Sequence, residues 1–186
     1  MTALFPGVLG ERFDALPPAV RRMHGGGRIT AAGRAVSAGR GVGALAARLL
    51  LGAPGRGRYA LRFEVEPGDG GETWTRWFGA QRLRSRLRPY PGDPRCLEER
   101  LGLASFRLAM RWAPSGFGWE LQGWRIGPLP LPRWLAPKVR ARCFEADGAY
   151  RFRVVVAHAW LGVVMAYAGR LQVDLEQVGI SRTIHL

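Results

Sequence analysis

The stretch that decides the fold is Glu72-Thr73-Trp74-Thr75-Arg76-Trp77-Phe78. Because side chains of a β-strand alternate between its two faces, this stretch places Trp74, Arg76 and Phe78 on one face. A charge buried between two aromatic side chains is costly unless it has a partner. We therefore expect Arg76 either to pair with a carboxylate or to face a wet cavity.

The alternation continues on both sides of this stretch. Residues 59–65 alternate apolar with polar side chains, and the Pro- and Gly-rich residues 67–71 predict a hairpin turn. In residues 81–88 two leucines and a serine alternate with four arginines, which predicts a strand with one buried face. The segments that alternate further along the chain are 104–112, 117–126, 139–146, 150–157 and 161–173. We expect an α+β chain of mostly antiparallel β structure, a curved sheet or β-barrel of about seven to nine strands.

Helices are expected in two places. Apolar residues recur at helical spacing in residues 5–24, but Pro17 and Pro18 interrupt them, which predicts one or two short N-terminal helices. A further helix is predicted near residues 42–51. Its start matches a dinucleotide-binding glycine pattern, yet the strands that follow are antiparallel, so we do not expect a nucleotide there. The proline-rich residues 127–137 predict an extended crossover whose Leu and Trp side chains cap the core.

Composition suggests a globular protein with an unusual charge. The chain has 186 residues, 47% of them hydrophobic, and a formal net charge of +14. Nearly all the positive charge is arginine, since Lys138 is the single lysine, and we interpret this as the bias of a GC-rich genome. A functional basic surface is the alternative. The length predicts one domain, over residues 5–173, with a polar C-terminal tail at 174–186.

Several common chemistries are not expected. The three histidines, His24, His158 and His185, have no metal-ligand spacing, so we predict neither a metal site nor a cofactor. Cys96 and Cys143 lack metal or redox motifs, which favours a reduced, cytoplasmic protein, with a disulfide between them left open.

Membrane and export signals are also not expected. The N-terminus does not resemble a signal peptide. The longest apolar run, residues 42–51, is shorter than the roughly 20 residues of a transmembrane helix.

A set of short motifs resembles one known family. The motifs are Leu9-Gly10, Leu16-Pro17 with His24, Trp74-x-Arg76-x-Phe78, Glu99-Arg100-x-Gly102, Leu129-Pro130-x-Pro132-x-x-Leu135-x-Pro137 and Gly162-x-x-x-x-Tyr167-x-Gly169. In this order and spacing, over roughly residues 5–173, the chain resembles the bacterial domain-of-unknown-function family DUF4166. That domain also occurs fused behind saccharopine-dehydrogenase-like reductases. The resemblance therefore implies a reductase-type partner and a hydrophobic metabolite, but no established activity.

These observations lead to one functional hypothesis with two alternatives. The first is a non-enzymatic domain that binds an apolar or lipid-like small molecule with an anionic head group. Its predicted ligand-binding residues are Arg76, Trp74, Phe78, Glu99, Trp119, Tyr167 and His24. One alternative is an enzyme that uses Glu99 or His24 as general base. The other is a basic module for an anionic membrane surface or nucleic acid, with nucleic acid the less favoured partner. A buried Arg76–Glu pair without any ligand is also compatible with the sequence.

Overall fold

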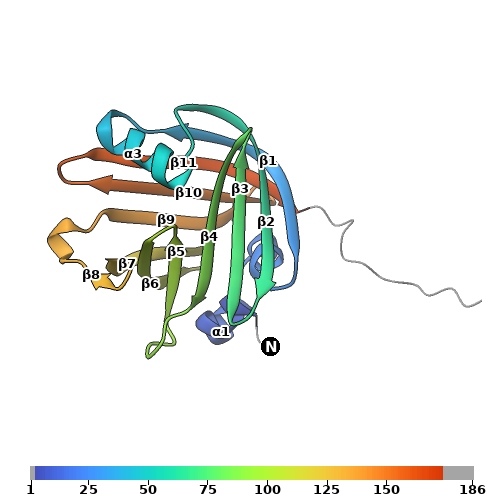
Figure 1. Ribbon diagram of the computed structural model, residues 1–186. Coiled ribbons are helices and arrows are strands. Elements are labelled where there is room, and N and C mark those ends of the chain that lie inside the picture. Colours follow the sequence, from blue (N-terminus) through green and yellow to red (C-terminus); the bar gives the residue numbers. More distant parts are fainter. Residues whose placement is uncertain (1–2, 174–186) are drawn as a thin grey trace, which may run out of the picture.

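The computed structural model describes residues 3–173, and the predicted polar tail at 174–186 lies outside this range. Ten antiparallel strands follow one another around a barrel (Figure 1). They are β1 (Ile29–Ala38), β2 (Gly57–Gly68), β3 (Gly71–Phe78), β4 (Gln81–Pro89), β5 (Cys96–Leu101), β6 (Ala104–Ala113), β7 (Gly116–Ile126), β9 (Lys138–Ala146), β10 (Ala149–His158) and β11 (Gly162–Val173). Pairing of β11 with β1 closes the ring. The predicted antiparallel barrel is confirmed.

The number of strands is larger than predicted. Besides the ten barrel strands, the two-residue β8 (Leu129–Pro130) pairs with the end of β7. Strand β5 was hard to recognise because Glu98, Glu99 and Arg100 follow one another and hide its alternation. Glu98 is nevertheless 3% exposed, since Arg88 and Arg125 both pair with its carboxylate. Two ion pairs therefore let a charged segment form a central strand.

The strand register confirms the inner face predicted for residues 72–78. In β3, Arg76 lies between Phe63 of β2 and Leu83 of β4. Trp74 and Phe78 share this face and are 5% and 0% exposed. Because register fixes which face each side chain takes, the whole inner surface of the barrel follows from these pairings.

Three short helices fill one end of the barrel. They are α1 (Leu4–Leu9), the 3-10 helix η1 (Gly10–Phe13) and α2 (Pro18–His24), and their apolar side chains join the core. Pro18 begins α2, where a missing N–H costs nothing. A carboxylate from the barrel then accepts one free donor of the first turn: the Ala19 N–H lies 2.6 Å from Glu145 Oε2. The expectation of short N-terminal helices is confirmed.

Helix α3 (Gly41–Leu51) connects β1 to β2 along the chain and lies at the opposite end of the barrel (Figure 1). It ends at Gly52, whose φ of 70° is left-handed. A Cβ there would also lie 2.4 Å from the Arg82 carbonyl oxygen, so the turn requires glycine. Strands β1 and β2 are antiparallel neighbours, which excludes the parallel unit of a dinucleotide-binding fold.

The crossover after β7 holds β8 and the 3-10 helix η2 (Arg133–Leu135), but its side chains do not cap the core. Leu129 and Trp134 are 62% and 66% exposed, so that expectation was wrong.

Cys96 and Cys143 are buried free thiols rather than a disulfide. Within residues 3–173 no helix is long and apolar enough to cross a membrane.

Candidate functional site

A cavity of about 110 Å³ lies inside the barrel, towards the α3 end. Its lining includes five of the seven residues predicted from the sequence, which are Trp74, Arg76, Glu99, Trp119 and Tyr167. Most other lining side chains are aliphatic. Helix α3 contributes Ala47 and Leu51, so this helix covers the cavity at its end of the barrel. A smaller space of about 40 Å³ adjoins it and shares Trp74, Arg76, Trp119 and Tyr167.

Arg76 is the cationic group of this cavity. Its residue is 9% exposed, and its guanidinium lies over the ring of Trp74 at 5.0 Å and that of Phe63 at 5.6 Å. Nη1 donates a hydrogen bond to Ser85 Oγ at 3.2 Å, while Nη2 lies 3.8 Å from Glu99 Oε1. That separation is an ion pair without a hydrogen bond. A guanidinium has five N–H donors, so Arg76 keeps donor capacity for a further acceptor.

Tyr167 and Glu99 lie beside Arg76 in the cavity wall. Burial raises the pKa of Tyr167, the positive charge of Arg76 opposes this, and the negative charge of Glu99 adds to it. The Tyr167 hydroxyl therefore stays protonated and can donate. The Glu99 side chain is 26% exposed and so keeps part of its hydration. Together these groups could bind one anionic oxygen between a guanidinium and a phenol.

Two predicted residues do not line the cavity. Phe78 packs behind Tyr167, with ring centroids 5.3 Å apart. His24 lies among the N-terminal helices, 1% exposed, and its Nε2 is 3.0 Å from the Tyr150 hydroxyl. Complete burial lowers the pKa of His24 to about 3, so this imidazole is neutral and enclosed. The arrangement gives His24 a place in the core and no access to the cavity.

Sequence reasoning did not single out several other lining residues. Val154, Val156 and Met165 alternate along β10 and β11, so their strand pattern could have identified them. Ala47 and Leu51 gave no such signal, because helical periodicity does not reveal which element a helix covers. Within the described range no cluster of His, Cys, Asp or Glu side chains could hold a metal ion.

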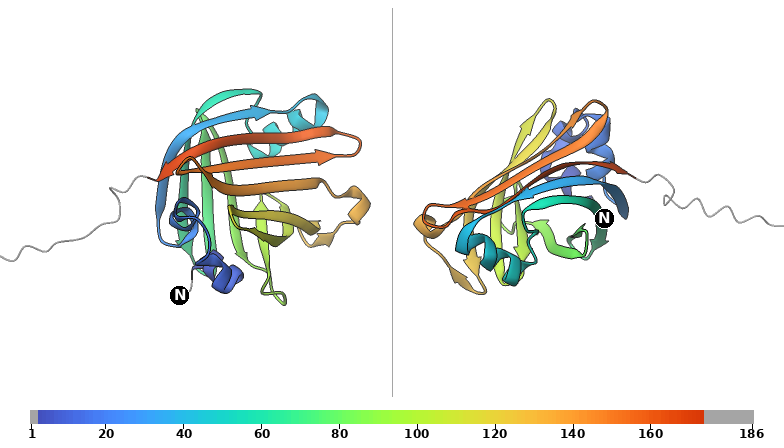
Figure 2. Two further views of the ribbon diagram at one scale, coloured as in Figure 1. Left: turned by 180° about the vertical axis from the view of Figure 1, so that it is seen from behind. Right: turned by 90° about the horizontal axis from the view of Figure 1, so that it is seen from above.

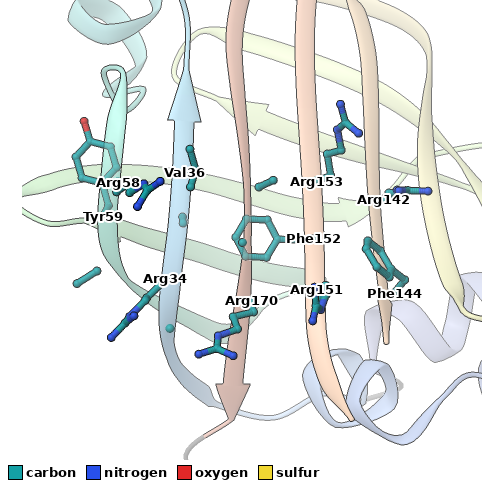
Figure 3. Close-up of a pocket in the computed structure, with 15 residues that line it drawn as sticks. Arg34, Val36, Arg58, Tyr59, Arg142, Phe144, Arg151, Phe152, Arg153 and Arg170 are labelled. Atoms are coloured by element: carbon teal, nitrogen blue, oxygen red, sulfur yellow. The ribbon is translucent and has the colours of Figure 1, made fainter. Parts of the chain in front are cut away.

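A second hollow lies outside the cavity, over strands β2, β1, β11, β10 and β9 (Figure 3). This arginine groove has a volume of about 910 Å³, and small residues such as Ala60, Ala168 and Gly169 form part of its lining. Six arginines line it: Arg34, Arg58, Arg142, Arg151, Arg153 and Arg170.

The cross-strand register places like charges together in this groove. Arg34 is directly opposite Arg170, and Arg170 is directly opposite Arg151. Like charges in such positions destabilise a sheet. Asp147 pairs with Arg151 from outside the groove lining. Folding therefore gathers arginines that lie far apart in the sequence on one surface of the sheet.

Comparison with known proteins gives a family but no activity. A family model described as "Domain of unknown function (DUF4166)" matches residues 16–171, which is most of the chain. No curated protein matches the sequence.

Proposed function

Because this chain belongs to the DUF4166 family, a domain of unknown function, we propose its function from the cavity geometry. The barrel binds a small, largely apolar molecule whose anionic group pairs with Arg76. The observation that carries the proposal is the guanidinium of Arg76, a residue only 9% exposed, in a cavity lined mainly by apolar side chains and with a carboxylate no closer than 3.8 Å. A ligand carboxylate would form charge-assisted hydrogen bonds that Glu99 leaves unmade.

The cavity size limits the ligand. Its volume of about 110 Å³ is below the approximately 150 Å³ of an engineered cavity that takes up benzene. It is also well below the roughly 300 Å³ at which pockets for drug-sized ligands begin. A short-chain acid, or at most a single-ring acid that also occupies the adjoining space of about 40 Å³, is therefore the favoured class. A long acyl chain would require Ala47 and Leu51 of α3 to move away from the barrel.

The proposal can be tested with pairs of acids and alcohols of similar size. We would measure the melting temperature of the wild type with benzoate against benzyl alcohol, and with hexanoate against hexanol. The acids are expected to raise the melting temperature more than the alcohols, because a ligand that binds the folded state stabilises it. Arg76→Met should remove that preference. Native mass spectrometry, followed by solvent extraction, would identify a ligand retained from the cell.

A matched variant controls for the loss of a positive charge. Arg84 lies on the exposed face of β4, close in sequence to the cavity residues but outside the lining. Arg84→Met should keep the preference for acids. If acids and alcohols stabilise the wild type equally, or if Arg76→Met keeps the acid preference, Arg76 does not bind the anionic group.

An enzymatic function at the same site would depend on Glu99. Of the two general bases considered from the sequence, Glu99 lines the cavity and His24 does not. Chemical change of a ligand extracted from the wild type, absent with Glu99→Gln, would favour catalysis over binding.

The arginine groove supports a second candidate function, the binding of a polyanion. Three arginines directly opposite one another on neighbouring strands destabilise the sheet, and an anionic ligand would reverse that effect. Retention on heparin should fall steeply with salt and should weaken in Arg34→Glu/Arg170→Glu. Arg21→Glu/Arg22→Glu, at exposed positions of α2, changes the net charge by the same amount as Arg34→Glu/Arg170→Glu. This control should elute from heparin at higher salt than Arg34→Glu/Arg170→Glu.

A further inference from the structure

Exposed apolar side chains gather at the α3 end of the barrel. Of the twelve large hydrophobic residues that are exposed in the described part of the chain, ten lie at this end. They are Val42, Leu45, Leu49, Leu103, Ile126, Leu129, Trp134, Trp160, Leu161 and Val163, which we call the apolar rim. Val42, Leu49 and Trp160 are 76%, 74% and 69% exposed. A single exposed leucine is ordinary, but a gathering of this size marks a surface for interaction.

The rim is continuous around this end of the molecule. Helix α3 packs on the β10–β11 turn so closely that a Cβ on Gly43 would lie 2.9 Å from the Leu161 Cβ. Trp160, which precedes Leu161 in that turn, faces Trp134 with ring centroids 5.8 Å apart. On the other side, the backbone N–H of Gly127 donates to the Leu103 carbonyl at 2.9 Å. Figures 1 and 2 show α3, the β10–β11 tip and β8 on the same side of the barrel.

The charge of this end has one sign. The segments that form it, 39–56, 79–80, 102–103, 127–137 and 159–161, contain no Asp or Glu. They contribute four arginines, Arg40, Arg48, Arg56 and Arg133, all exposed. The loops at the opposite end carry both signs, with acidic residues such as Asp69, Asp93 and Asp147. The loops and the helix at the α3 end therefore combine the apolar rim, which includes two tryptophans, with arginine side chains and contain no carboxylate side chain.

From this combination we propose that the apolar rim docks on the surface of an anionic lipid bilayer. Tryptophan prefers the boundary between headgroups and acyl chains, and arginine reaches from there to lipid phosphates. Helix α3 matches an interfacial helix, because Val42, Leu45 and Leu49 face solvent while Ala47 is 4% exposed and lines the cavity. Positive charge without carboxylates complements anionic headgroups. The docked surface would surround the end of the barrel where α3 covers the cavity.

The test uses lipid vesicles and the full-length chain. We would measure co-sedimentation with phosphatidylcholine vesicles and with mixed phosphatidylcholine–phosphatidylglycerol vesicles at about 0.1 M salt, where screening acts beyond about 10 Å. The wild type should bind the mixed vesicles and bind pure phosphatidylcholine more weakly. Trp134→Ala/Trp160→Ala and, separately, Arg40→Glu/Arg48→Glu should each weaken binding about tenfold or more.

Matched controls identify the surface that binds. Arg21→Glu/Arg22→Glu makes the same charge change at the opposite end and should bind like the wild type. Arg76→Met should also bind vesicles normally, so failure of the cavity proposal and failure of this one are distinguishable. The four positions changed at the α3 end are all exposed. A melting temperature equal to that of the wild type would verify that each variant is folded.

Three results would overturn the proposal. One is that Trp134→Ala/Trp160→Ala and Arg40→Glu/Arg48→Glu both bind the mixed vesicles as strongly as the wild type. Another is equal loss of binding in the control Arg21→Glu/Arg22→Glu. The third is a wild type that ignores mixed vesicles but forms dimers that Trp134→Ala/Trp160→Ala disrupts, because the rim would then bind a second copy of the chain.

Discussion

The buried imidazole of His24 predicts a specific loss of stability in mild acid. Burial lowers its pKa from 6.5 to about 3 in the folded protein, while the unfolded chain keeps the ordinary value. Between these values the unfolded state takes up a proton that the folded state excludes. The stabilising contribution is therefore complete above pH 6.5 and is lost as the pH falls towards 3.

The size of the effect follows from that pKa difference. In this window the free energy of unfolding should fall by about 1.4 kcal/mol for each pH unit. At pH 5 the protein should therefore be less stable than at pH 7 by about 2 kcal/mol from this residue alone.

Urea unfolding followed by tryptophan fluorescence at several pH values would measure this slope. His24→Gln keeps a polar group near the Tyr150 hydroxyl but has no proton to gain, so its stability should change less between pH 7 and 5. Other titrating groups contribute equally to both proteins, which makes the difference between the two slopes the decisive quantity. Equal slopes for the wild type and His24→Gln would refute the reasoning.

Three further predictions concern stability and can be checked by denaturant unfolding. Arg76→Met should change the unfolding free energy by less than about 1 kcal/mol, because Glu99 is partly hydrated; a loss of about 3–5 kcal/mol would instead indicate a buried structural pair. Glu145→Ala should cost about 1 kcal/mol by removing the acceptor for the first turn of α2, and an unchanged midpoint would contradict that role. Gly169→Ala should be clearly more destabilising than Gly68→Ala, since a Cβ at 169 would lie 2.3 Å from a backbone oxygen of β1 and one at 68 meets open space; similar losses would argue against this close approach.

The inner wall of the barrel could be predicted because strand alternation is a local property. Trp74, Arg76 and Phe78 share a face in any strand, whichever strands lie beside it. Trp119 and Tyr167 followed from the same pattern. The cavity itself could not be predicted, since its volume depends on how α3 packs on β11 and on which side chains meet across the barrel.

Other features depend on contacts that local patterns do not contain. The position of His24 in the core depends on Tyr150, far away in sequence. The arginine groove depends on strand register. Arg34 and Arg151 lie far apart in the sequence, and only the pairing of their strands with β11 brings both of them next to Arg170. The prolines of residues 127–137 predicted an extended segment with Trp134 over the core. In the described structure Trp134 instead lies on the surface, and its only close aromatic partner there is the exposed Trp160.

The central claim is that the barrel cavity holds an acid through Arg76. The most direct measurement is an NMR titration of the wild type with benzoate, following the indole N–H signals of Trp74 and Trp119, which both line the cavity. The claim predicts saturable shifts of these two signals with benzoate, weaker shifts with benzyl alcohol, and loss of the benzoate effect in Arg76→Met. Unchanged Trp74 and Trp119 signals in the wild type, or the same benzoate shifts in Arg76→Met, would contradict it.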